Sequence, residues 1–308
     1  MSTPLDRRLM GSSELRSLVD YFMADEGIEL NILSAVFFNK NNKIYSIKIS
    51  GRTIHPDLRV NYDYLEELIP ILSKFDELTE LGIANYTDRV LPSSLGSLQH
   101  ITNLYINESY NLFQEGSTDR SAKNLQSITF PKAVKHLAMG SNQITLRTLP
   151  GSIQDLDLTH LSLTGNRITT LPHWISKLTN LEEIWMRGNK IENMDELAPL
   201  KKLRVIQLGI NKIQEIPAFI ENLSSLEILE LEENKLREIP TGLTKLTKLR
   251  QLRLNNNYIS KIPHDLVLRA DGLLDLEALI ETNNFSSDEK NKISALLRIV
   301  PESTSGSI

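Results

Sequence analysis

The chain has 308 residues, of which 40% are hydrophobic and 24% are charged, and its formal net charge is −5 at pH 7. These proportions are ordinary for a folded domain, and the mild negative charge gives no support to nucleic-acid binding, which usually needs a basic face. The chain has no cysteine, which excludes disulfides, thiolate metal sites and a cysteine nucleophile.

Residues 1–43 are expected to form an N-terminal helical cap. Apolar residues at helical spacing fall on one face of residues 12–26. The N-terminus leads into no apolar region typical of a secretory signal peptide, and the longest apolar stretch, around Ile32–Phe38, is too short to span a bilayer. We therefore expect a cytoplasmic protein without a membrane partner.

The first strand is predicted at Ile44–Ile49, where apolar residues begin to alternate. A helix is predicted within Asp63–Phe75, with Pro70 as a kink or break. Two further repeats begin at Leu78 and Ile101, and each lacks an asparagine that recurs later in the chain.

Residues 107–133 interrupt the period. The polar stretch Asn107–Ala122 is expected to form a protruding loop. Residues 125–131 could instead form a strand, and this alternative would displace the frame that begins at Val134.

From Val134 onward the pattern LxxLxLxxN returns six times, followed two residues later by isoleucine or leucine. Its asparagines are spaced by 24, 23, 22, 23 and 23 residues. The pattern predicts strands at 137–139, 161–163, 184–186, 206–208, 229–231 and 252–254. Between them, segments such as Leu171-Pro172 to Leu178 read LPxxIxxL, and the proline ends the strand where the chain must turn.

The C-terminal part departs from this pattern. We expect a last, irregular strand at Leu276–Ile280. A C-terminal capping helix is predicted at 286–301, because Ser286 can cap it and Pro301 ends it. Residues 302–308 are expected to be a disordered tail.

The repeat is identified as a member of the leucine-rich-repeat family, and its LPxxIxxL segments resemble the type found in intracellular Ras-interacting scaffolds and in bacterial and archaeal proteins. The resemblance implies an α/β repeat solenoid, a right-handed horseshoe with a concave parallel sheet and helical caps at both ends. It covers residues 44–285 in about nine repeats, irregular at 107–133.

The recurring asparagines are interpreted as a structural ladder, because an amide can satisfy backbone groups where a strand becomes a loop. They are Asn142, Asn166, Asn189, Asn211, Asn234 and Asn257.

Residues between the inward leucines should point outward and pave the concave face. Trp185 is the candidate anchor, since tryptophan and arginine are enriched in binding hot spots. The alternative is that Trp185 packs against its neighbours. The candidate partner-binding residues are Tyr105, Trp185, Arg187, Gln207, Glu230, Glu232, Arg253 and Asn255.

Two charged groups keep two interpretations each. The glutamates at 227, 230, 232 and 233 lie next to arginines on adjacent strands, which indicates either cross-strand ion pairs or a charged docking patch. His136 and His160 share one repeat position, either as a metal or pH-sensing pair or as solvated surface residues without a carboxylate beside them.

Motifs of nucleotide-binding, metallopeptidase and serine-hydrolase sites are absent from the sequence. The leading interpretation is a non-catalytic interaction module or scaffold that binds a protein partner on its concave face, without a cofactor and as a monomer. An effector translocated to a host cell is a variant of this interpretation. The alternative is a recruitment or regulatory subunit of an enzyme, or an enzyme with an unrecognised concave-face site.

Overall fold

The computed structural model describes residues 33–38, 43–50, 64–84, 91–108, 128–269 and 272–299. They belong to two units, Met1–Leu158 (unit 1) and Thr159–Ile308 (unit 2), and each is treated by itself. The predicted helix at 12–26 and the predicted tail at 302–308 lie outside the described residues. The predicted loop at 107–122 does so too, apart from Asn107, which ends a strand, and Glu108.

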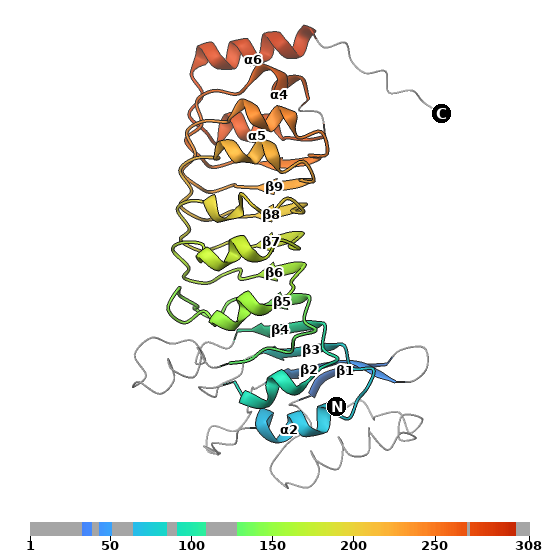
Figure 1. The fold of residues 1–308 in the computed structure, drawn as a ribbon. Coiled ribbons are helices and arrows are strands. Elements are labelled where there is room, and N and C mark those ends of the chain that lie inside the picture. Colours follow the sequence, from blue (N-terminus) through green and yellow to red (C-terminus); the bar gives the residue numbers. More distant parts are fainter. Residues whose placement is uncertain are drawn as a thin grey trace, which may run out of the picture. The chain divides into compact units, whose positions relative to one another are not determined.

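Unit 1 carries strands β1 (Leu33–Phe38), β2 (Ile44–Ser50), β3 (Glu80–Ala84), β4 (Asn103–Asn107) and β5 (His136–Ala138). They lie side by side in chain order, and helix α2 (Tyr64–Leu72) stands between β2 and β3 in the chain (Figure 1). Strands β2 to β5 run parallel, whereas β1 is antiparallel to β2.

Strand β1 lies within residues 1–43, for which a helical cap was expected, and corrects that expectation at 33–38. Its sequence, LSAVFF, is an almost unbroken apolar run, and such a run of six residues fits a strand better than the 3.6-residue period of an amphipathic helix. The alternative strand at 125–131 is also wrong where it can be checked, because residues 128–130 form no strand. The frame that begins at Val134 therefore holds, with β5 at His136–Ala138.

One apolar column holds the parallel strands of unit 1 together. Ile47, Leu81, Leu104 and Leu137 lie opposite one another in register, and none is more than 1% exposed. Burial of such a side chain contributes about 1.5–3 kcal/mol. Each repeat is thereby stabilised by its neighbours, as expected for a repeat array.

Unit 2 repeats the same arrangement with shorter strands. These are β6 (His160–Ser162), β7 (Glu183–Trp185), β8 (Val205–Gln207), β9 (Ile228–Glu230) and β10 (Gln251–Arg253). They are parallel and pair in sequential order (Figure 1). Their central residues are at most 2% exposed, and they are Leu161, Ile184, Ile206, Leu229 and Leu252.

Every strand from β5 to β10 begins and ends one residue earlier than predicted. The second apolar residue of each LxL, such as Leu208 or Leu231, is fully buried but lies just past the strand. The prediction centred the strand on the pair of leucines, whereas the backbone pairing is centred on the first. Each unit is a segment of a repeat solenoid with a parallel sheet.

The segments between strands are short 3₁₀ helices. They are η3 (Ser93–Ser97), η5 (Gly151–Asp155), η6 (His173–Lys177), η7 (Asp195–Leu197), η8 (Ala218–Asn222) and η9 (Thr241–Lys245). All but η7 follow a proline whose φ lies between −60° and −69°. The fixed φ of proline ends the extended segment and starts the turn.

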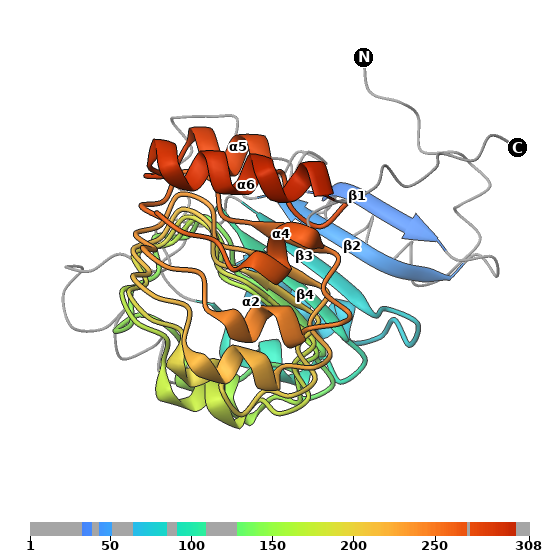
Figure 2. The ribbon, with the colours of Figure 1, turned by 90° about the horizontal axis from the view of Figure 1, so that it is seen from above.

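Helices α4 (His264–Leu268), α5 (Leu276–Glu281) and α6 (Ser287–Ile299) end unit 2, and α6 lies beside α4 (Figure 2). The prediction of a strand at 276–280 is wrong. Asp275 caps α5 by accepting a hydrogen bond from the Ala278 amide at 2.9 Å, and a side-chain cap of this kind favours a helix. At the start of α6, the Glu289 amide donates to Ser286 Oγ at 3.2 Å.

Candidate interaction surface on the sheet of unit 2

Seven of the eight candidate partner-binding residues lie in unit 2, on or just after strands β7 to β10. We call this surface the strand face, and it consists of Trp185, Arg187, Gln207, Glu230, Glu232, Arg253 and Asn255. The eighth candidate, Tyr105, lies on β4 in unit 1 and is described separately.

Trp185 is the exposed apolar residue of the strand face. It is 41% exposed, and its in-register neighbours are Ser162 on β6 and Gln207 on β8. Neither neighbour is large and apolar, so part of the indole remains open to solvent. The interpretation in which Trp185 is packed away by its neighbours therefore accounts for only part of its surface.

The carboxylate of Glu230 lies under two donors from the next strand. Gln251 Nε2 donates to Glu230 Oε1 at 2.8 Å, and Arg253 Nε lies 3.4 Å from the same oxygen. Glu230 is consequently only 7% exposed, although its strand position points away from the leucine core. Arg253 is the outer partner of this pair, with a side chain that is 56% exposed.

A second ion pair spans two repeats. Arg187, after β7, is paired with Glu232, after β9, while Gly209 occupies the corresponding position after β8. A Cβ atom on Gly209 would lie 2.6 Å from both Arg187 Nη1 and Glu232 Cδ. The absence of a side chain at Gly209 therefore leaves the space in which the two charged groups meet. Arg187 Nη2 also lies 3.6 Å from Glu233 Oε1.

A third group of charges lies at the start of the strands. Arg204 Nε donates to Glu227 Oε1 at 2.7 Å, and Arg250 Nε lies 3.4 Å from Glu227 Oε2. The hydrogen bond from Arg204 lowers the pKa of Glu227, and the same bond raises the pKa of Arg204. Cross-strand ion pairs are thus present for the glutamate cluster, which was one of its two interpretations. Solvent-exposed pairs contribute little stability each.

A polar hollow of about 770 Å³ opens at the C-terminal side of the strand face. Its lining consists of charged and amide side chains that lie just after β7 and β9 and on or beside β10, together with residues 272–275. The charged groups are Arg187, Glu232, Glu233, Arg250, Arg253 and Asp275. This hollow was not predicted, because the sequence pattern does not show how residues 272–275 fold back toward β10, where the Leu252 amide donates to Leu273 O at 2.8 Å.

Tyr105 lies between two small residues in unit 1. Gly82 on β3 and Ala138 on β5 are its in-register neighbours. The ring is partly buried, and this burial raises the pKa of Tyr105, as does the charge of Glu80. Because both flanking residues are small, they cover little of the ring on the outer face of the sheet, so Tyr105 remains a candidate contact of unit 1.

The two histidines of the same repeat position begin strands β5 and β6. His160 Nε2 lies 3.3 Å from Glu183 Oε1, so a carboxylate does stand beside it, contrary to the prediction. The reason is that Glu183 occupies the in-register position on the next strand. Within the described residues, no group of three or more potential ligands could hold a metal ion.

The asparagines of unit 2 connect successive repeats. Asn211 Nδ2 donates to the carbonyl oxygens of Met186 and Leu208, both at 3.0 Å, and Asn211 Oδ1 accepts from the Ile191 amide at 2.9 Å. Asn189, one repeat earlier, and Asn234 and Asn257, one and two repeats later, make the same set of bonds. Asn166 donates to Leu163 O at 2.8 Å, and in unit 1 Asn142 donates to Ile106 O.

Sequence reasoning missed the last member of this series. Asn283 Oδ1 accepts from the Ile259 amide at 3.0 Å, and its Nδ2 donates to Leu254 O at 3.1 Å. It follows helix α5 instead of a strand and lies 26 residues after Asn257, so the LxLxxN frame does not include it. The signal that could have found Asn283 is its distance along the chain from Asn257, which is close to one repeat.

The residue just before each asparagine of the ladder adopts a left-handed backbone. These residues are Ser141, Gly165, Gly188, Ile210, Glu233 and Asn256, with φ between 51° and 70°. Glycine adopts this conformation without strain, whereas a β-branched residue does so at a cost. Ile210 is the β-branched member, and its side chain is 40% exposed.

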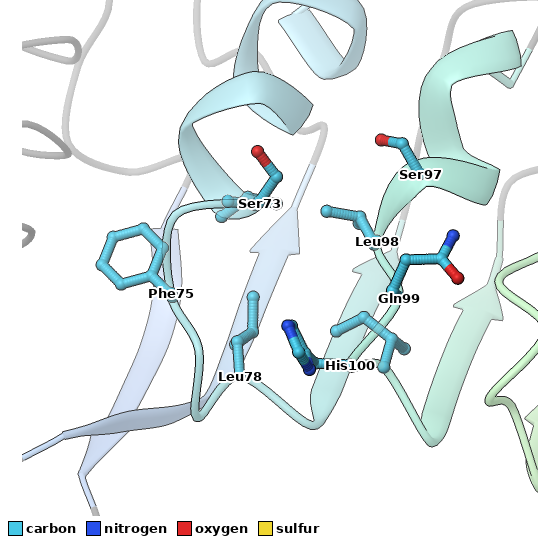
Figure 3. A pocket seen from close by; sticks show the side chains of 9 residues that line it. Ser73, Phe75, Leu78, Ser97, Leu98, Gln99 and His100 are labelled. Atoms are coloured by element: carbon cyan, nitrogen blue, oxygen red, sulfur yellow. The ribbon is translucent and has the colours of Figure 1, made fainter.

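A smaller hollow of about 180 Å³ lies in unit 1, between the end of α2 and the segment after η3 (Figure 3). Phe75, Leu78, Leu98 and His100 are among its lining residues. It carries no charged carboxylate or amine, and its shape follows from the packing of two successive repeats.

No helix in the described residues is long and apolar enough to cross a membrane.

Comparison with protein families supports the repeat assignment in unit 2. A family model described as "Leucine rich repeat" matches residues 201–259, and one described as "Leucine Rich repeats (2 copies)" matches residues 157–199. The matched segments contain β7 to β10 and most of the asparagines described above.

Three curated proteins are similar over part of the chain. An adenylate cyclase of Schizosaccharomyces pombe is 26% identical over 174 residues, or 54% of this chain. The geranylgeranyl transferase type-2 subunit alpha of Homo sapiens is 38% identical over 72 residues, or 23% of this chain. A volume-regulated anion channel subunit of Xenopus tropicalis is 30% identical over 205 residues, or 51% of this chain. The matches span only 10%, 12% and 25% of those proteins.

Solved structures with leucine-rich repeats are also similar. The ectodomain of a membrane receptor kinase of Arabidopsis thaliana has a TM-score of 0.46 and 29% identity, covering 64% of this chain and 23% of that one. A leucine-rich-repeat protein of Leptospira interrogans has a TM-score of 0.42 and 19% identity, covering 82% of this chain and 88% of that one. The family-model matches and the repeated strand and asparagine arrangement show that residues 157–199 and 201–259 of this chain are leucine-rich repeats.

Proposed function

We propose that the chain is a non-catalytic interaction module that binds a protein partner through the strand face of unit 2. Leucine-rich-repeat domains are generally protein-interaction modules. The observation that carries the proposal is Trp185, a tryptophan 41% exposed on a sheet surface between a serine and a glutamine. An exposed indole surrounded by polar and charged groups is the composition of a binding hot spot with a polar rim.

The charged residues around Trp185 support a role in specificity. Arg187 and Arg253 have side chains that are 38% and 56% exposed, and each is held by a carboxylate beneath it. Ion pairing restricts both guanidinium groups to directions that point at their carboxylates before a partner arrives, which lowers the entropy lost on binding. Charges at the rim of an interface mainly affect the rate of association. Arg253→Glu should therefore slow association with the partner.

The proposal is tested by replacing two exposed aromatic residues of unit 2. Trp185→Ala removes the aromatic group of the strand face, whereas Tyr258→Ala removes one that is 53% exposed beyond the asparagine turn. Proteins captured by the wild type from the native lysate are identified, and their affinities for both variants are measured. Trp185→Ala should weaken binding by at least about 2 kcal/mol, while Tyr258→Ala should not. Equal affinities for wild type and Trp185→Ala would refute the strand face as the binding site.

A recruitment or regulatory subunit of an enzyme is the second candidate. Two of the similar proteins are an enzyme and an enzyme subunit by name, but the matches cover 10% and 12% of their lengths. The partner recovered in the capture experiment distinguishes the candidates, because a regulatory subunit should bind a catalytic chain through the same face.

A further inference from the structure

One buried polar atom of the strand face lacks a hydrogen-bond partner among the described residues. The Oε2 oxygen of Glu232 is buried and unpaired, whereas its Oε1 oxygen is paired with Arg187. The side chain of Glu232 is only 10% exposed. A buried carboxylate oxygen without a donor is costly, because it has lost water without gaining a hydrogen bond. This oxygen is therefore an acceptor that is not used within the described residues.

The arginines that line the same hollow are already engaged. Arg187 is paired with Glu232 and Glu233, Arg250 with Glu227, and Arg253 with Glu230. The guanidinium groups around the hollow thus have carboxylate partners, while one carboxylate oxygen has none. The unmet requirement of the site is for a donor and not for an acceptor.

A second carboxylate, that of Glu233, lines the hollow nearer to solvent. Glu233 stands beside Glu232 in the chain, its side chain is 47% exposed, and its ion pair with Arg187 has a nitrogen–oxygen distance of 3.6 Å. A group with several N–H donors could therefore contact the buried carboxylate and the exposed one together. A guanidinium or ammonium group has such donors, and charged hydrogen bonds are stronger than neutral ones.

Two of the arginine side chains that line the hollow are open to solvent. Arg187 is 38% exposed, and Arg253 is 56% exposed. Exposed side chains change rotamer on the picosecond to nanosecond scale. A partner's donor can thus reach the oxygen when the Arg187 guanidinium turns toward Glu233, without rearrangement of the leucine core.

We propose that the hollow over β9 and β10 receives a basic side chain, arginine or lysine, of the protein partner, which donates a hydrogen bond to Glu232 Oε2. This proposal rests on the proposed function, since the hollow is part of the strand face that includes Trp185. It adds the chemistry of the partner: a segment with a basic residue placed where the apolar contact with Trp185 and the contact with Glu232 can form together.

An acidic partner residue fits the site less well. It would meet arginines that already have carboxylate partners and would face Glu232 and Glu233 at close range. Like charges brought together in an interface disfavour binding. The proposal therefore predicts that a basic residue at this position of the partner strengthens binding and that an acidic residue weakens it, which a binding experiment can measure.

The experiment selects binders from a random peptide library displayed on phage, using the full chain as target. Peptides selected by the wild type should carry arginine or lysine at one fixed position relative to an apolar residue. Selection on Glu232→Gln should lose that enrichment. The control variant Glu238→Gln removes an exposed carboxylate elsewhere in unit 2 and should keep it. The thermal midpoint of each variant is measured first.

The peptide side provides a second test that does not depend on the folding of a variant. Replacing the selected arginine by citrulline, which keeps the shape but not the charge, should weaken binding to the wild type about 10-fold or more. The loss of affinity caused by citrulline should be smaller on Glu232→Gln than on the wild type.

Two failures can be told apart. Peptides that need Trp185 but show no basic preference, or show an acidic one, would overturn the basic-residue proposal and leave the proposed function standing. The same holds if Glu232→Gln, folded as the wild type, binds the arginine peptide equally well. A library that yields no peptide sensitive to Trp185→Ala would overturn both.

Discussion

The two units hold neighbouring repeats together in different ways. In unit 1, β3 pairs with both β2 and β4 through five residue pairs in register. In unit 2, each pair of adjacent strands has three. The short strands of unit 2 are followed by asparagines, whereas β3 and β4 are followed by Tyr86 and Ser109 at the equivalent positions.

The same relation holds inside unit 1. Strand β5 has only three residues, and it is followed by Asn142, which donates to the carbonyl oxygen of Ile106 on β4. The length of a strand thus varies with the presence of the asparagine. A longer backbone ladder and an amide that bonds three backbone groups are alternative ways to satisfy the polar groups between repeats.

The largest effect is expected from placing a charge in the apolar column of either unit. Leu229→Asp places a carboxylate among fully buried leucines, and Leu81→Asp does the same in unit 1. Each should destabilise its unit by about 3–5 kcal/mol, since an uncompensated buried charge has no partner. The loss of unfolding free energy is measured by denaturant unfolding, and hydrogen exchange shows which unit is affected. Thermal midpoints equal to the wild type would mean that these positions do not point inward.

Removal of one asparagine side chain should distinguish the two ways of linking repeats, which are the asparagine ladder and the longer backbone pairing. Asn211→Ala leaves the amide of Ile191 and the carbonyls of Met186 and Leu208 without their side-chain partner. We expect a loss of about 1–3 kcal/mol in unfolding free energy. The matched variant Asn103→Ala, at a half-buried strand position of unit 1, should cost much less. Similar losses for both would remove the distinction between the asparagine ladder and an ordinary strand residue.

A stabilising change is expected where unit 2 carries strain. Ile210 adopts φ 51° at a position that Asn256 occupies in a later repeat with φ 54°. Ile210→Asn should raise the unfolding free energy by about 1 kcal/mol, because asparagine tolerates the left-handed region better than a β-branched residue. Gly188→Ala, at the same repeat position with φ 70°, should have the opposite sign. A destabilised Ile210→Asn would indicate that the isoleucine side chain makes a contact worth more than the strain.

The smallest effect is expected from filling the space at Gly209. Gly209→Ala should separate Arg187 from Glu232 and lower the unfolding free energy by about 1 kcal/mol or less, because both charged groups can move toward solvent. Gly151→Ala in unit 1 has no atom within 4 Å of its new Cβ and serves as the control. If Arg187→Ala loses the same free energy in the wild type and in Gly209→Ala, the pair does not depend on Gly209.

Much of the repeat architecture could be predicted from the sequence because it depends on local spacing. The inward leucines, the proline-led turns and the asparagine positions all recur about every 23 residues. Errors arose where the period ends. At 276–281 the apolar spacing is compatible with a strand or a helix, and the cap at Asp275 decides for a helix. In the first 43 residues, strand β1 pairs antiparallel with β2, whereas the repeat pattern predicts only parallel neighbours.

The candidate surface could be predicted only in part. The outward position of Trp185 follows from strand alternation, and its exposure agrees with that position. Glu230 and Glu232 were expected on an open surface, yet they are only 7% and 8% exposed. Their burial depends on side chains one and two repeats away, including the missing side chain of Gly209. No local pattern in the sequence expresses such a contact.

The pairing of Arg187 with Glu232 has a consequence for how unit 2 unfolds. Solenoid stability is usually a sum of intrinsic repeat terms and nearest-neighbour terms, as in a one-dimensional Ising chain. A bond that passes over the repeat of Gly209 adds a next-nearest-neighbour term. The repeats of β7, β8 and β9 are then coupled as a group of three. Unfolding of the β9 repeat weakens the β7 repeat, although the two repeats are not adjacent. Because this term is about 1 kcal/mol or less, it should narrow the differences in exchange free energy among the amides of β7 to β9 without making them equal.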